Sequence, residues 1–235
     1  MGVPGAYGRI IPSALYLRFI TVSIQVLENL RGFSMAKILS DLTSTIIAGI
    51  VLAVVLIIVM MGMHDATPTF DKSYWSFLFR WLHVLSGVMW IGILWYFNFV
   101  QIPTMPSIPD ELKPAVGKHI APAALWWFRW GAMGTIVTGL ILAAMNGYIV
   151  EAISLGLTDG VPKHTAIGIG MWLGTIMWFN VWFIIWPAQQ KALGIVDAEP
   201  DVKAASARTA MLFSRTNTLL SFPMLYAMVS AQNIY

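Results

Sequence analysis

Five apolar segments, each close to the length that crosses a lipid bilayer, constrain this chain more than any other feature of its sequence. They cover residues 42–62, 77–100, 123–147, 164–186 and 209–231. A helix crosses the hydrocarbon core with about 20 apolar residues. Because backbone groups in lipid must be satisfied within the protein, the segments predict an all-α integral membrane protein of about five transmembrane helices.

The composition supports a membrane environment and removes several classes of function. Hydrophobic residues make up 58% of the chain and charged residues 11%, whereas a soluble domain carries roughly 25% charged residues. The absence of cysteine excludes disulfides, thiolate metal sites, iron–sulfur clusters and covalently attached c-type haem. The net charge of +3 comes without a basic run, so no nucleic-acid partner is expected.

The lysines and arginines between the segments predict the orientation. Nine fall on one side of the predicted helices and three on the other. Cytoplasmic loops carry the excess of positive charge. We therefore expect the N-terminus in the cytoplasm and the C-terminus in the periplasm of a bacterial inner membrane. The first group is Arg9, Arg18, Arg31, Lys37, Lys113, Lys118, Lys191, Lys203 and Arg208, and the second is Lys72, Arg80 and Lys163.

Two regions of different character are expected along the chain. Residues 1–41 mix apolar and charged side chains and are predicted to form a cytoplasmic N-terminal extension. Within it, residues 12–30 have the composition of an amphipathic helix lying on the membrane surface, and a poorly ordered tail is the alternative. Residues 42–235 are predicted to be the transmembrane domain. The first segment lacks a small-residue cleavage site at its end, which favours an anchor over a removed signal.

An internal repeat relates the second and fourth segments. The same residue types recur in the same order, with one extra residue in the second copy. If each copy is a two-helix unit, four of the five helices form a bundle of two parallel two-helix repeats, and functional sites tend to lie at such repeat interfaces. Chance similarity between membrane helices is the alternative. The first copy is His83, Gly87, Trp90, Gly92 and Asn98, and the second is His164, Gly168, Trp172, Gly174 and Asn180.

The repeat places His83 and His164 at the same side of the membrane. A histidine at membrane depth is a candidate functional residue, and two imidazoles from facing helices can ligate a haem b iron. Gly87 and Gly168, one turn from each histidine, would let a flat macrocycle approach the backbone, and Trp90 shares the His83 face. The simpler alternative is a pair of hydrated histidines at helix ends.

A copper or zinc site formed by His64, His83 and His164 is a third possibility, because imidazole suits both metals.

Other polar and soft side chains are expected to have structural roles. Arg129, among Trp126, Trp127 and Trp130, is predicted to extend toward the headgroups. Asn98 and Asn180 are predicted to form hydrogen bonds between helices. The methionines are expected to be lipid-facing filler rather than metal ligands.

Residues 76–233 resemble a known membrane domain. The matching stretches are Arg80-Trp-Leu-His83 through Trp90-Ile-Gly92, His164 through Pro187-Ala-Gln-Gln-Lys191, and Asn217 through Ser230-Ala-Gln-Asn233. They are similar to the membrane domain of bacterial urate hydroxylase, also called cytochrome c urate oxidase. The resemblance implies a domain that oxidises urate and passes electrons to cytochrome c on the periplasmic side, with His83 and His164 as haem or active-site histidines.

Two departures from the family accompany this resemblance. The cysteine-free chain would be a short form that lacks the family's cytochrome c domain. The last helix of the family begins with a His-Asn-Asn type motif, where this chain has Ser214-Arg215-Thr216-Asn217.

Two functions from different classes fit these observations. The first is a membrane redox protein that binds haem b and exchanges electrons with a periplasmic cytochrome c. The second is a non-catalytic accessory subunit, without a cofactor, that packs against other membrane subunits of a larger respiratory, photosynthetic or oxidising complex. Whether the chain is an enzyme stays open at this stage.

Overall fold

The computed structural model describes residues 35–63 and 69–235, and within these ranges helices are the only regular secondary structure. The prediction of an all-α membrane protein is confirmed. The chain divides into two compact units, Met1–Pro68 and Thr69–Tyr235. The predicted amphipathic helix at 12–30 and His64 lie outside the described residues.

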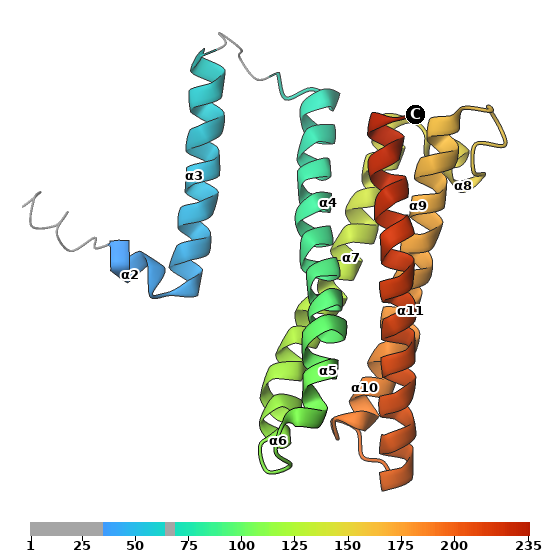
Figure 1. Cartoon of the computed structure of the whole chain (residues 1–235). Helices are drawn as coiled ribbons and strands as arrows, with labels where there is room; N and C mark the ends of the chain where they lie inside the picture. The colour runs from blue at the N-terminus through green and yellow to red at the C-terminus, as the bar shows by residue number, and fades with distance from the viewer. Residues whose placement is uncertain (1–34, 64–68) are drawn as a thin grey trace, which may run out of the picture. The chain divides into compact units, whose positions relative to one another are not determined.

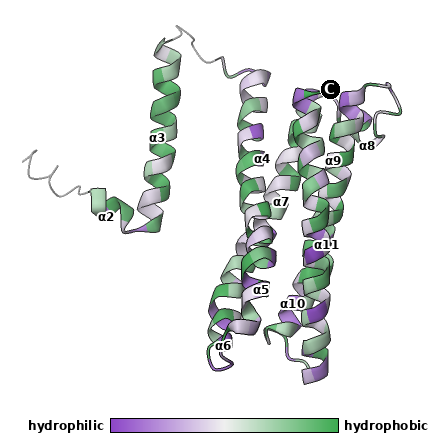
Figure 2. Ribbon diagram, in the orientation of Figure 1, coloured by the Kyte–Doolittle hydropathy of each residue, from purple (hydrophilic) through white to green (hydrophobic). Residues whose placement is uncertain are grey.

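The first unit contains the short helix α2 (Met35–Leu39) and the long helix α3 (Leu42–Met63). The Asp41 carboxylate accepts a hydrogen bond from the Ser44 backbone N–H at 2.8 Å, which caps the start of α3. None of the α3 residues is buried, and Figure 2 shows the helix hydrophobic along most of its length. Because it is apolar on every side, α3 requires lipid or other helices around it, which agrees with a transmembrane anchor.

Four long helices form the bundle of the second unit: α4 (Lys72–Trp95), α7 (Ala121–Asn146), α9 (Pro162–Phe179) and α11 (Pro200–Asn233). Figure 1 shows α4 and α9 running in the same direction and α7 and α11 in the opposite one. This order is the one that two parallel two-helix repeats require. α8 and the C-terminus lie at one end of the bundle, and α6 lies at the other.

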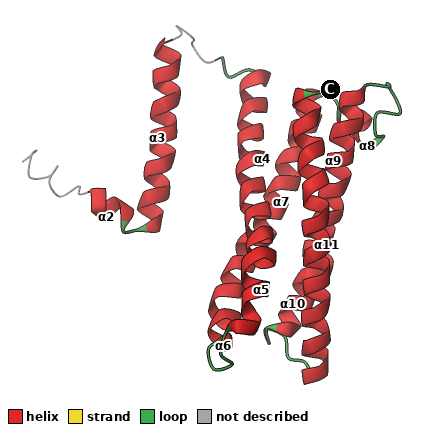
Figure 3. Ribbon diagram, viewed as in Figure 1, coloured by secondary structure: helices red, strands yellow, loops and turns green. Residues whose placement is uncertain are grey.

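Short helical segments extend or connect the long ones, and Figure 3 shows how little of this unit is loop. They are η1 (Tyr96–Gln101), α5 (Ile102–Thr104), η2 (Met105–Ser107), α6 (Lys113–Ala115), η3 (Val116–Ile120), α8 (Ile149–Ile153), η4 (Asn180–Ile185) and α10 (Trp186–Ala192).

Four continuous helical runs of the described chain are long and apolar enough to cross a membrane. They are Leu42–Met63, Lys72–Ser107, Lys113–Asn146 and Pro162–Ala192, which confirms four of the five predicted spans. The fifth segment forms α11, whose 34 residues are long enough but less apolar. Polar side chains lower its hydropathy: Arg215 on the exposed face, and Ser214, Asn217, Thr218, Ser221 and Ser230 on the buried face.

Three π-helical turns share one cause. η1, η3 and η4 each end two residues before a proline: Pro103, Pro122 and Pro187. Proline lacks an N–H and its ring clashes with the carbonyl four residues earlier. Widening the preceding turn lets the helix continue, as where the Trp186 N–H bonds to the Val181 carbonyl. Since η1 and η4 contain Asn98 and Asn180, the two copies of the repeat share this feature.

Within each half, small residues bring the helices close together. A Cβ built at Gly131 of α7 would lie 3.1 Å from the Trp90 backbone nitrogen of α4, and one at Gly134 would lie 2.8 Å from the Ser86 Oγ. Such small-residue contacts are the usual basis of helix association in membranes. α4 packs most extensively on α7, and α9 on α11, so the two halves meet along a looser interface.

Candidate functional site

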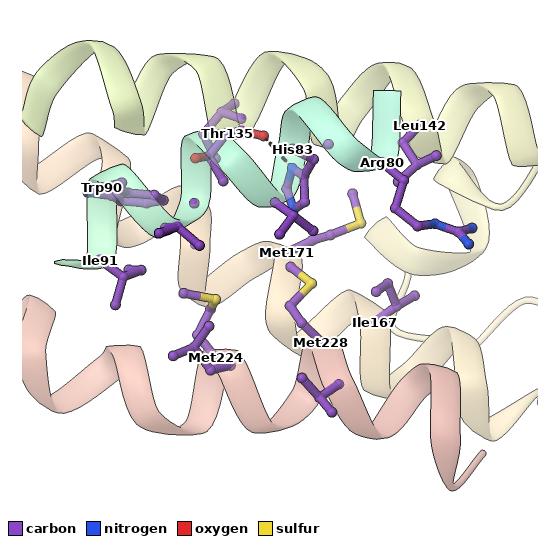
Figure 4. Close-up of a pocket in the computed structure, with 18 of the residues that line it drawn as sticks. Arg80, His83, Trp90, Ile91, Thr135, Leu142, Ile167, Met171, Met224 and Met228 are labelled. Carbon is purple, nitrogen blue, oxygen red and sulfur yellow. Dashed lines mark hydrogen bonds between the residues drawn. The ribbon is translucent and has the colours of Figure 1, made fainter. Parts of the chain in front are cut away.

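A cavity of about 650 Å³ lies where the two halves of the bundle meet (Figure 4). All four long helices contribute to its wall, which is almost entirely apolar. This volume lies within the range of roughly 300–1,000 Å³ that is usual for ligand and cofactor pockets. The cavity is therefore the candidate functional site of the second unit.

His83 is the polar side chain whose orientation in the cavity is best defined. Its Nδ1 lies 2.8 Å from the Thr135 carbonyl oxygen and 3.4 Å from the Thr138 Oγ1. A carbonyl can only accept, so Nδ1 carries the proton and donates to Thr135. The lone pair is then on Nε2, the nitrogen that a metal would bind.

Gly139 of α7 makes this orientation possible. A Cβ at that position would lie 2.9 Å from the His83 Cε1 and 3.1 Å from its Nδ1. Any larger residue would therefore displace the imidazole ring. One side of the His83 ring packs against α7 at Gly139. Figure 4 shows the ring directed into the cavity.

Glycines also leave the cavity wall flat. Gly87 and Gly92 of α4 and Gly174 of α9 line the cavity, and a Cβ at any of them would meet open space. Trp90, 1% exposed, also lines the cavity. The wall therefore offers a smooth apolar surface that suits a flat ligand.

The end of the cavity next to α8 carries Arg80 and Tyr148. Burial raises the pKa of the Tyr148 hydroxyl, and the positive charge of Arg80 opposes this effect. The two side chains are thus electrostatic neighbours, and Arg80 supplies a positive charge where a ligand could place an anionic group.

His164 lies outside the lining of this cavity. Its Nδ1 is 2.5 Å from the Asp159 Oδ2, and its ring stacks on that of Tyr148 with a centroid separation of 5.9 Å. The Val161 backbone N–H, followed by His164, holds the pKa of the Asp159 carboxyl below its ordinary value. His164 and His83 are therefore on the same side of the bundle but in different environments.

Gly168 also has a role that differs from the predicted one. A Cβ there would collide with the carbonyl of Ala152 in α8. This glycine allows α8 to pack on α9, whereas Gly87, its counterpart in the repeat, faces the cavity. Among the predicted cofactor residues, the structure brings together His83, Gly87 and Trp90 in the cavity wall.

The structure does not test the predicted copper or zinc site of His64, His83 and His164. Among the described residues, no group of three or more histidine, aspartate or glutamate side chains could hold a metal ion. His64 belongs to the residues that the structure does not describe. The site of His64, His83 and His164 stays a prediction.

The prediction for Arg129 is wrong. Its side chain is only 9% exposed, and the guanidinium carbon lies 3.3 Å from the centre of the Trp186 ring. Its Nη1 has no hydrogen-bond partner among the described residues. The cation–π contact with α10 holds this arginine inside the bundle instead of at the headgroups.

The two asparagines bond between helices, as predicted. Asn98 donates to the Ser214 Oγ at 2.8 Å, and Asn180 donates to the Asn217 Oδ1 at 2.8 Å. Both partners lie on α11. These bonds join α11 to the helical runs of both repeat copies.

The sequence did not single out the thioether groups of the cavity. Met171 of α9 and Met224 and Met228 of α11 all line it, although the methionines were expected to face lipid. Met224 is buried in the core. The spacing of four residues between Met224 and Met228 places both on one face of α11, but composition alone cannot say which face turns inward.

Comparison with known proteins gives one result. The family described as urate oxidase N-terminal matches residues 159–234, which contain α9, η4, α10 and α11 and thus one half of the bundle. This region is therefore related to that family. No curated protein and no solved structure matches the chain.

Proposed function

We propose that this chain is a urate-hydroxylase-like membrane redox protein that would bind haem b in the cavity, where the His83 Nε2 would hold the iron. The observation that carries the proposal is the orientation of His83. Its Nδ1 donates to the Thr135 carbonyl, its ring lines a cavity of about 650 Å³, and glycines leave the adjoining wall flat.

The remaining lining fits the parts of a haem. Gly87, Gly92 and Gly174 give the macrocycle room against α4 and α9. Arg80 lies where it can pair with the carboxylates at the haem edge, close to the outer end of the bundle. The bound group would supply one-electron chemistry, while the chain fixes the imidazole, excludes water and provides the apolar surroundings that tune the potential.

Urate is the electron donor that the family relation of residues 159–234 suggests, and a periplasmic cytochrome c is the acceptor that the resemblance of the chain to urate hydroxylase suggests. Both assignments are part of the proposal. Spectra recorded on adding urate and then oxidised cytochrome c test them, because urate should reduce the bound haem and cytochrome c should reoxidise it.

The primary experiment is a dithionite-reduced minus oxidised spectrum of the protein in mild detergent, with a pyridine haemochrome assay for stoichiometry. We expect a b-type spectrum that His83→Ala abolishes. His164→Ala, which alters the Asp159 contact outside the cavity, should retain it. His119→Ala is the matched control, because His119 is exposed and lies in η3, outside the cavity lining.

A well-folded protein that contains no haem when produced with haem available would contradict the proposal. The accessory-subunit hypothesis predicts that outcome, together with co-purification in a larger membrane assembly. Gel filtration and circular dichroism of His83→Ala separate loss of a ligand from loss of the fold.

A further inference from the structure

We infer that the cavity opens sideways into the lipid bilayer between α4 and α11, and that its ligand is an anionic amphiphile that enters from the lipid phase and places its charged end at Arg80. The opening is a part of the cavity wall that the proposed function does not use. The inference rests on the proposed function only where it identifies the amphiphile as haem, and the opening itself is tested without haem.

Three valines, Val84 and Val88 of α4 and Val229 of α11, mark the place where the cavity wall becomes the outer surface. All three line the cavity, yet each is 54–67% exposed. The valines of α3, a helix with no buried residue, are 47–55% exposed. The three rim valines are therefore exposed like residues on the outside of a membrane helix, and unlike Trp90, which lines the same cavity and is buried.

The contact between α4 and α11 lies on one side of this opening. The Trp95 Nε1 donates to the Ser221 Oγ of α11 at 3.0 Å, and the Trp95 ring stacks on Phe222 with a centroid separation of 5.4 Å. Among residues 69–235, every hydrogen bond and aromatic contact between α4 and α11 involves Trp95. Beyond Trp95, side chains of the two helices, such as Ile91 and Met224, are directed into the cavity (Figure 4). The opening thus extends from Trp95 toward the end of the bundle that contains the C-terminus.

The opening lies at a depth where lipid surrounds the protein. Val84 and Val88 belong to the helical run Lys72–Ser107, which is long and apolar enough to cross a membrane. The hydrocarbon core of a bilayer contains no water. A molecule that reaches the cavity between these helices therefore comes from the lipid phase.

Polar side chains gather at one end of the opening. Arg80 precedes Val84 by about one helical turn, and Gln232 and Asn233 follow Val229 by about one turn. None of the ion pairs within residues 69–235 involves Arg80, so no carboxylate in this range neutralises its charge. An arginine and two amides beside an apolar wall suit an amphiphile with an anionic end. Haem, with its flat apolar ring and its carboxylates, belongs to this class.

Photolabelling in phospholipid vesicles tests the opening. The full chain is produced without added haem, shown to be haem-free by its absorption spectrum, and labelled with a small apolar diazirine that partitions into the bilayer. We expect mass spectrometry to find label on Trp90 and Met224, which line the cavity but are buried from the outer surface, and on α3. A water-soluble diazirine should leave Trp90 and Met224 unlabelled.

A pair of tryptophans placed at the rim should close the opening. We expect the double variant Val88→Trp, Val229→Trp to lose the label on Trp90 and Met224 and to keep the label on α3. The matched control is Leu85→Trp, Leu219→Trp, because both leucines are exposed on the same two helices and lie outside the cavity lining. Circular dichroism confirms that each variant folds.

Competition with two amphiphiles of equal chain length tests the role of Arg80. A long-chain alkyl phosphate should protect Trp90 from the apolar label more strongly than the corresponding alcohol, and Arg80→Gln should remove this difference. Arg215→Gln is the control, because Arg215 is exposed on α11 and lies outside the cavity lining. Equal protection by the phosphate and the alcohol in the wild-type protein would overturn the assignment of Arg80.

Absence of the apolar label from Trp90 and Met224 would overturn the opening, since a protein helix would then cover it, even if the chain binds haem. Labelling of these residues by the water-soluble reagent would also overturn it. Labelling as expected, in a chain that never binds haem, would instead support the opening and contradict the proposed function.

Discussion

At the scale of single residues, position in the repeat does not fix the role of a side chain. Gly87 and Gly168 occupy matching places in the sequence, yet one faces open space in the cavity and the other contacts the Ala152 carbonyl. His83 and His164 differ in the same way. The local surroundings decide the role, because His83 bonds to a carbonyl of the neighbouring helix α7 and His164 to a carboxylate in the loop before its own helix.

The two glycines lead to opposite expectations for the same substitution. Gly168→Ala should destabilise the fold by about 1–3 kcal/mol, since the added methyl meets a backbone carbonyl that cannot move freely. Gly87→Ala should fold normally, because its methyl enters the cavity. Thermal unfolding in detergent, followed by circular dichroism, measures the difference. Equal stability of the two variants would show that α8 does not pack on Gly168 as described.

The stability of the loop between α8 and α9, which contains Asp159, should depend on pH. The Asp159 carboxyl pKa is lowered in the folded state from the ordinary value of 3.8, so its contribution is present above pH 3.8 and is lost as the pH falls through the lower folded value. Asp159→Asn should therefore reduce the acid sensitivity of unfolding in detergent. An identical pH profile for wild type and variant would contradict this.

At the scale of helices, two buried amide side chains, one on α11 and one in the π-helical turn η4, together with a backbone carbonyl of α9, hold one half of the bundle together. Asn217 is 0% exposed. It accepts from Asn180 at 2.8 Å and donates to the Met177 carbonyl at 2.9 Å. In lipid there is no water to replace these bonds, which explains why a polar face on α11 is compatible with a membrane bundle.

Removing this amide should loosen the α9–α11 contact. We expect Asn217→Ala to cost about 1–2 kcal/mol, because Asn180 and Met177 lose their partner. Thr216→Ala is the control, since its hydroxyl is exposed and bonds only to the Leu212 carbonyl of its own helix. Denaturant unfolding in mixed micelles measures both.

A double-mutant cycle tests whether the lost stability comes from the hydrogen bond between Asn180 and Asn217. Asn180→Ala combined with Asn217→Ala should cost less than the sum of the single variants, because neither amide is then left unpaired. Strict additivity would indicate that the two side chains do not interact.

At the scale of the whole molecule, the loop charges still predict an orientation that labelling can test. The α5–α6 connection lies at one end of the bundle, and the α8–α9 connection lies at the end with the C-terminus (Figure 1). The sequence contains no cysteine, so single cysteines can be introduced without background. Both Glu111 and Leu157 are exposed, the latter by 87%.

We expect an impermeant thiol reagent added to intact cells to modify Leu157→Cys but not Glu111→Cys. After the membrane is opened, both should react. This result follows if the positively charged loops remain in the cytoplasm. Modification of Glu111→Cys alone in intact cells would show that the bundle has the opposite orientation, with His83 near the cytoplasmic side.

Hydropathy and repeat spacing were enough to predict the class of fold, four of the spans, the parallel order of the two halves and the interhelical bonds of Asn98 and Asn180. They were sufficient because the solvent, lipid, acts on each helix separately. The orientation of the Arg129 side chain toward the bundle interior could not be predicted, because it depends on a contact with Trp186, 57 residues further along the chain.

The sequence by itself determined that this chain is a helical membrane protein, and it predicted a doubled helix pair with a histidine in each copy. Only the tertiary structure decided that His83 lines a cavity, that His164 pairs with Asp159, and that methionines face inward from α9 and α11. The physical reason is rotation about the helix axis. In an apolar helix several faces are equally suited to lipid, and packing against neighbouring helices selects the one that turns inward.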